Sequence, residues 1–67
     1  MLKEIIETDA VLIKEILSGD GIVSAEYIQK KTNYRRAYVH LVLGWLYKEN
    51  EISFLERDDD LYIQLNL

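Results

Sequence analysis

Cysteine and proline are both absent from this 67-residue sequence, and glycine occurs only three times. Without cysteine the chain has no disulfide, no thiolate nucleophile and no cysteine-ligated zinc site. No apolar run approaches the roughly 18 residues that a membrane-spanning helix needs, and no signal peptide is recognisable, so we expect a cytoplasmic protein without membrane contact. Because proline, repeats and low-complexity stretches are all missing, we expect residues 1–67 to form a single domain.

What is present is a globular composition with an uneven distribution of charge. Hydrophobic residues make up 49% of the chain, and the net charge is −4. Residues 1–23 and 48–67 are acidic, whereas half of all the cations fall within one short segment: Lys30, Lys31, Arg35 and Arg36. The net negative charge argues against an indiscriminate binder of nucleic acid or of anionic membranes. The cationic cluster is therefore either a solvated surface that offsets acids elsewhere or a local binding site.

The first part of the chain shows an amphipathic helical pattern. The apolar residues that recur at helical spacing are Leu12, Ile13, Ile16 and Leu17, and glycines at 19 and 21 predict that this helix ends near residue 18. Extending the helix back to Leu2 places Asp9 inside the apolar stripe, where an unpaired carboxylate is costly. We therefore expect Thr8 or Asp9 to be the N-cap, with residues 1–8 as an arm or a short preceding helix.

Two further helices are predicted after the glycines and a very short strand. Ser24 is expected to cap a helix over 25–31, and a turn over 32–34 leads to a third helix over about 35–49. On a helical wheel one broad face of this third helix is formed by Tyr38, Val39, Leu41, Val42, Trp45 and Leu46. The opposite stripe contains Arg36, His40, Gly44 and Tyr47.

The end of the chain changes to a period of two. Apolar residues alternate with polar ones over 52–54 and 61–66, which predicts a hairpin with residues 56–60 as its connection. Two helices joined by a three-residue turn and followed by a hairpin are typical of a winged helix-turn-helix. We therefore predict an α+β fold with three helices, a small antiparallel sheet and a C-terminal β-hairpin wing.

One segment of the third helix also resembles a known family. The run Leu43-Gly44-Trp45-Leu46, followed by residues 48–52 and by the ending Leu-Tyr-Ile-Gln-Leu at 61–65, is similar to a small prokaryotic winged helix-turn-helix family long catalogued as a domain of unknown function. The resemblance covers residues 9–65. It implies the winged-helix fold and a DNA-binding, transcription-regulator type of role. Unlike that family pattern, this chain has three aspartates in its wing turn, at 58–60.

Double-stranded DNA is the first partner that the pattern suggests. In helix-turn-helix proteins the second helix of the motif enters the major groove with its N-terminal residues at base edges. Arg36 and His40 would then face bases, while Lys30, Lys31 and Arg35 would hold phosphates.

A protein partner, or a homodimer, is the alternative. Gly44 lies in mid-helix, where glycine costs roughly 1 kcal/mol relative to alanine, and such a residue usually lets another backbone come close. That backbone could belong to the first helix or to a second molecule. The residues that we expect at such an interface are Leu2, Ile5, Ile6, Gly44 and Tyr47.

Catalysis, metals and cofactors have little support in the sequence. His40 is the only histidine, and the aspartates at 58–60 lack the alternating spacing and the glycine of a calcium loop. No serine is paired with a histidine and an acid in a recognisable pattern, and no glycine-rich loop precedes a helix. We therefore expect a non-enzymatic protein with no cofactor and no small-molecule substrate.

Overall fold

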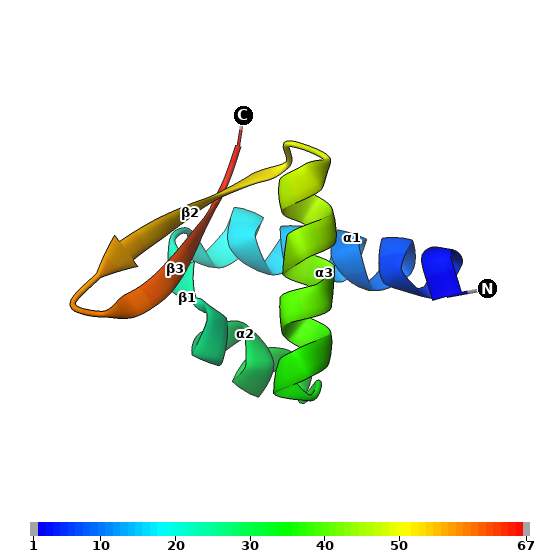
Figure 1. The fold of residues 1–67 in the computed structure, drawn as a ribbon, viewed down its shortest axis with the longest axis horizontal. Helices are drawn as coiled ribbons and strands as arrows, with labels where there is room; N and C mark the ends of the chain where they lie inside the picture. The colour runs from blue at the N-terminus through cyan, green and yellow to red at the C-terminus, as the bar shows by residue number, and fades with distance from the viewer. Residues whose placement is uncertain (1, 67) are drawn as a thin grey trace.

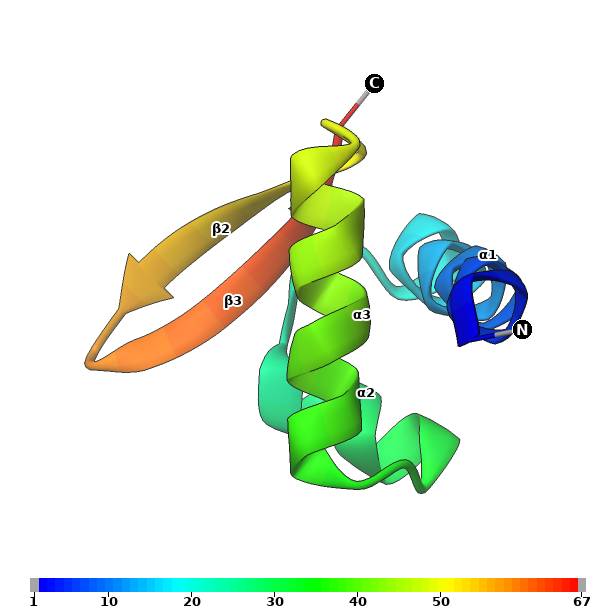
Figure 2. The same ribbon diagram turned by 45° about the vertical axis from the view of Figure 1, so that its right-hand side comes forward.

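The computed structural model describes residues 2–66, so the first and last positions of the expected domain lie outside the described residues. The order of elements is α1 (Leu2–Asp20), β1 (Val23–Ser24), α2 (Ala25–Thr32), α3 (Arg36–Lys48), β2 (Ile52–Arg57) and β3 (Asp60–Leu65). The strands form one antiparallel sheet in the order β1-β3-β2. α1 crosses behind α3 in Figure 1, and Figure 2 shows α1 on one side of α3 and the β2–β3 wing on the other. This arrangement confirms the predicted winged helix-turn-helix.

The hydrophobic core receives side chains from all six elements. Its members are Ile6, Ala10, Ile13, Leu17, Val23, Ile28, Val39, Val42, Leu43, Leu46, Ile52 and Ile63. Burying one such aliphatic side chain fully stabilises a fold by about 1.5–3 kcal/mol. Because α3 contributes four of the twelve, this core fixes its orientation toward the wing on one side and α1 on the other. No helix within residues 2–66 is long and apolar enough to cross a membrane.

The prediction of a separate N-terminal arm is wrong. α1 runs without a break from Leu2, and Asp9 lies inside it rather than at its N-cap. The carboxylate that appeared too costly to bury is half-buried and partnered: Tyr34 donates a hydrogen bond of 2.9 Å to Oδ1, and the Tyr38 hydroxyl donates to Oδ2. These two bonds remove the penalty for placing a carboxylate beside the core.

The two helices of the helix-turn-helix segment differ in their side-chain caps. Ser24 caps α2 as predicted, because its side chain accepts a hydrogen bond of 3.0 Å from the Tyr27 amide. Asn33 ends α2 in the left-handed conformation, at φ 60°, and does not cap α3. The N-cap position of α3 is Arg35, which makes no side-chain cap bond within the described residues.

The buried face of α3 is rotated relative to the predicted one. Leu41 was placed on that face but is 49% exposed, whereas Leu43 is only 1% exposed. The core lies between the wing and α1, so the centre of the buried face falls nearer to Leu43 than to Leu41.

The wing connection is shorter than predicted. β2 and β3 continue to the pair Arg57–Asp60, so only Asp58 and Asp59 form the turn. Their φ values are 50° and 68°, the left-handed conformation that a two-residue hairpin turn of type I′ requires at both positions. Aspartate tolerates this conformation better than most residues, which explains a tight turn without glycine.

Candidate nucleic-acid interface

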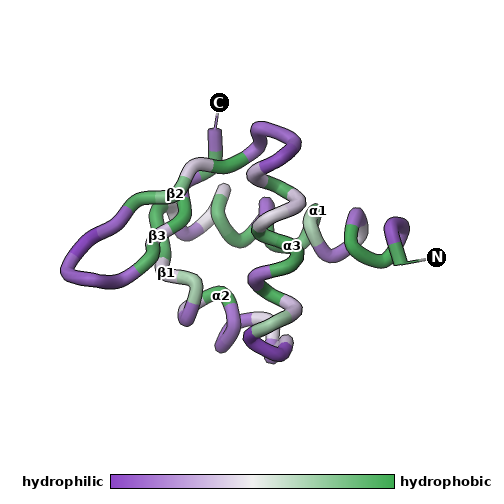
Figure 3. The backbone as a smooth tube through the Cα atoms, viewed as in Figure 1, coloured by the Kyte–Doolittle hydropathy of each residue, from purple (hydrophilic) through white to green (hydrophobic). Residues whose placement is uncertain are grey.

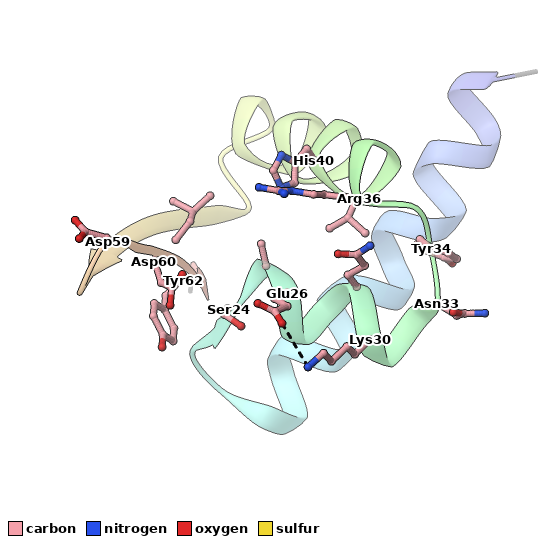
Figure 4. Close-up of a pocket in the computed structure, with 14 residues that line it drawn as sticks. Ser24, Glu26, Lys30, Asn33, Tyr34, Arg36, His40, Asp59, Asp60 and Tyr62 are labelled. Atoms are coloured by element: carbon pink, nitrogen blue, oxygen red, sulfur yellow. Dashed lines mark ion pairs between the residues drawn. The ribbon is translucent and has the colours of Figure 1, made fainter.

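A groove lies between α2, the first half of α3 and the tip of the wing. Its volume is about 610 Å³. α3 contributes Arg36 and His40, α2 contributes Lys30, and the wing contributes Asp59 and Asp60 (Figure 4). We call this surface the α3–wing groove.

The two walls of the α3–wing groove differ in charge. Arg36 and Lys30 place cations on the helical wall, where Lys30 also forms an ion pair of 3.4 Å with Glu26, four residues earlier. Both side chains of that pair are about three-quarters exposed, so the pair contributes little to stability and leaves Lys30 free to exchange partners. Asp59 and Asp60 make the opposite wall acidic. In Figure 3 the wing tip and the turn before α3 are both hydrophilic, as are the connection after α3 and parts of α1.

The structure divides the cationic cluster. Arg36 and Lys30 line the groove, and Arg35 is exposed immediately before α3. Lys31 points elsewhere: its Nζ lies 3.9 Å from Asp20 at the end of α1 and 5.9 Å from the centre of the Tyr27 ring. The four cations are close in sequence, but a helix turns by about 100° per residue, so Lys30 and Lys31 leave α2 in different directions.

The opposite stripe of α3 is exposed as predicted. Arg36, His40, Gly44 and Tyr47 are all exposed side by side along the helix. A Cβ added to Gly44 would meet no atom within 4 Å, so Gly44 does not serve close packing against α1. Tyr47 is 58% exposed, and its ring stacks on Phe54 of β2 with a centroid distance of 5.0 Å.

The residues predicted for a protein interface are only partly available. Ile6 was expected at the interface but belongs to the core at 9% exposure, one turn before Ala10 on the buried side of α1, so it is not available for contact with a partner. Leu2 and Ile5 are 60% and 53% exposed, on the part of α1 that extends past α3 (Figure 1).

Three features of the site were missed from the sequence. Glu26 shares the groove with Lys30, and its spacing of four residues from that lysine was the available signal. Asp59 and Asp60 are predicted in the wing turn, but no sequence pattern places them in a wall of the groove. The contact between Tyr47 and Phe54 joins residues of a helix and a strand, and no sequence spacing reports it.

Metal-binding chemistry has no geometric basis in the described part of the chain. Residues 2–66 contain no group of three or more histidine, cysteine, aspartate or glutamate side chains placed to hold a metal ion. His40 is exposed on α3.

Comparison with protein families agrees with this geometry. A family model described as a winged helix-turn-helix domain (DUF2582) matches residues 1–65. The chain belongs to this winged helix-turn-helix family. No curated protein and no solved structure shows significant similarity to this chain. Membership of the family establishes the fold and is compatible with DNA or protein partners.

Proposed function

We propose that this winged helix-turn-helix domain binds double-stranded DNA through α3, as a small module of the transcription-regulator type. The observation that carries the proposal is the shared exposure of Arg36 and His40, one turn apart on the N-terminal half of α3. This is the part of a recognition helix that reaches base edges in the major groove. Arginine is the commonest side chain to read guanine there, through O6 and N7.

The surroundings of Arg36 supply two phosphate contacts. Lys30 lies on the same groove, and Arg35 is exposed at the start of α3. The first backbone amides of a helix lack partners inside the helix and favour a phosphate through the helix dipole. Lys31 lies outside the α3–wing groove, on the side of α2 that faces Asp20, so it is not counted among these contacts.

The acidic wall limits how DNA is bound. Asp59 and Asp60 repel a phosphate backbone, so the wing makes no phosphate contact, and α3 with the end of α2 supplies the attraction. Affinity for random DNA is therefore modest, and discrimination rests on the base contacts of α3.

The test is a titration of a fluorescently labelled mixed-sequence duplex, followed by anisotropy at about 50 and 200 mM salt. Two phosphate contacts give a slope of log affinity against log salt of about −1.8, at roughly −0.9 for each. Arg36→Ala weakens binding strongly, whereas Lys3→Ala, which removes an exposed cation at the start of α1 and outside the α3–wing groove, leaves it unchanged. Absence of binding at the lower salt would reject the proposal.

A homodimer is the second candidate, and exposed apolar residues on α1 favour it. Leu2 and Ile5 on α1 expose more than half of their surface, and Leu41 on α3 about half. The test is the mass in solution by sedimentation equilibrium. If the dimer forms through this end of α1, the Ile5→Asp variant is monomeric and the Val11→Asp variant remains dimeric. Val11 is a matched control because it has the same 53% exposure but lies on another side of the helix. A monomeric wild-type protein at every concentration contradicts this candidate.

A further inference from the structure

No contact or backbone conformation within the described residues requires glycine at position 44. It lies in the interior of α3, it is exposed, and an added Cβ would meet nothing within 4 Å. Its φ is not in the positive range that favours glycine over other residues. An interior helical glycine lowers stability relative to alanine. The reason for glycine at this position therefore lies outside the domain.

The neighbours of Gly44 show where that reason lies. His40 is one turn earlier on the same exposed stripe, and Tyr47 follows three residues later. The Tyr47 ring stacks on Phe54 and so does not cover the position of Gly44. The missing side chain leaves a notch in the face of α3 that carries the proposed base-reading residues.

The dimensions of DNA place a backbone at this notch. Gly44 is eight residues beyond Arg36, a distance of about 12 Å along the helix axis. The major groove is about 8.5 Å deep and about 12 Å wide, so a helix whose first turn reaches the base edges brings the residues two turns later beside the strand that borders the groove.

We propose that Gly44 is the point at which the DNA sugar–phosphate backbone approaches α3 most closely, and that the absence of a Cβ there lets Arg36 and His40 reach the base edges. This inference rests on the proposed DNA-binding function. Gly44 is a positioning residue: it makes no base contact of its own. A methyl group at this position lifts α3 out of the groove and lengthens the hydrogen bonds made by the residues one and two turns earlier.

The test compares Gly44→Ala with Gly19→Ala. Gly19 is a matched control because it is also helical, exposed and free of any atom within 4 Å of an added Cβ, but it lies at the end of α1. Alanine raises the melting temperature in both variants, by up to about 4–8 °C at the interior position and by less at the helix end. On a duplex selected for tight binding to the wild-type protein, Gly44→Ala binds about tenfold more weakly than wild type, the loss expected when one base contact is weakened. Gly19→Ala binds as wild type, and neither variant changes the salt slope because no charge is altered.

Each outcome decides between the two proposals. If wild type binds DNA and Gly44→Ala binds equally well, the role of Gly44 is overturned while the DNA-binding function stands. If wild type does not bind, the function itself fails, and the inference with it. A lower melting temperature for Gly44→Ala would overturn the inference by revealing an internal need for glycine. A change of mass in solution would overturn it by assigning the notch to a protein contact.

Discussion

Tyr38 on the first turn of α3 donates its hydroxyl hydrogen to the carboxylate of Asp9 in the middle of α1, twenty-nine residues earlier. Tyr34 donates to the other carboxylate oxygen, and the two tyrosine rings meet edge to face with centroids 5.3 Å apart. This cluster ties α1 to the turn that precedes α3. It therefore holds the start of the proposed recognition helix in place.

Removing the carboxylate loosens this connection. Asp9→Ala leaves two half-buried hydroxyls without their partner and lowers the free energy of unfolding by about 1–3 kcal/mol. Glu15→Ala, an exposed site on the same helix, changes it by less than about 0.5 kcal/mol. Urea denaturation of both variants measures the difference, and equal effects would contradict a structural role for Asp9.

The same cluster makes stability depend on alkaline pH. Burial, together with the hydrogen bond and the charge of Asp9, raises the pKa of Tyr38 to about 12, whereas an unperturbed tyrosine has a pKa of about 10. The fold thus favours the neutral phenol, and its contribution is complete below about pH 10 and is lost as the pH rises toward about 12. Tyr38→Phe is less stable than wild type at neutral pH, and we expect the difference in unfolding free energy to shrink across this range. A difference that stays constant with pH would refute this account.

Two neighbouring aspartates of the wing respond in opposite directions to the same substitution. Asp59 has φ 68°, so Asp59→Gly relieves left-handed strain and raises the free energy of unfolding by about 1 kcal/mol. Asp60 begins β3 and pairs with Arg57, so Asp60→Gly lowers it by about 0.5–1 kcal/mol. Each variant removes one negative charge, which cancels any general effect of charge in the comparison. Thermal melts that shift in the same direction would argue against the type I′ turn.

The stacked pair of Tyr47 and Phe54 fastens the wing to α3. Tyr47→Ala removes the stack and lowers the free energy of unfolding by about 0.5–1.5 kcal/mol beyond the loss of buried area. Leu41→Ala, at a similarly exposed position of α3, serves as the control and has a smaller effect. Hydrogen exchange of the β2 amides is the sharper readout, since the wing opens more often once the stack is gone.

The sequence predicted the elements of the fold well because their signals are local. Ser24 caps α2 where expected, and the alternation over 52–54 and 61–66 became the wing. Asp9 misled the prediction because the cost of burying a carboxylate depends on its partners, and the two tyrosines that supply them lie more than 20 residues away. Leu41 was predicted on the buried face of α3, but Leu43 is buried instead, for a similar reason. A helical wheel gives the period of a face, whereas the neighbouring elements decide where the centre of the buried face lies.

The candidate site could be predicted in part. The exposed stripe with Arg36 and His40 follows from helical period alone, and the structure retains it. The different directions of Lys30 and Lys31 also follow from helical period, but the position of Asp20 beside Lys31 depends on how α1 packs against α2. The acidic wall of the groove could not be predicted, because it depends on the approach of the wing toward α2. No local sequence pattern indicates this relationship between elements.

β3 lies between β1 and β2 in the sheet, although it follows both of them in the chain. Residues 2–59 contain all three helices and the strands β1 and β2, neither of which has a pairing partner within that segment. Ile63, which is fully buried and opposite both Val23 and Phe54, comes after every other member of the core in the chain. The sheet therefore cannot form without residues 60–65, because β3 supplies all of the strand pairing of both β1 and β2.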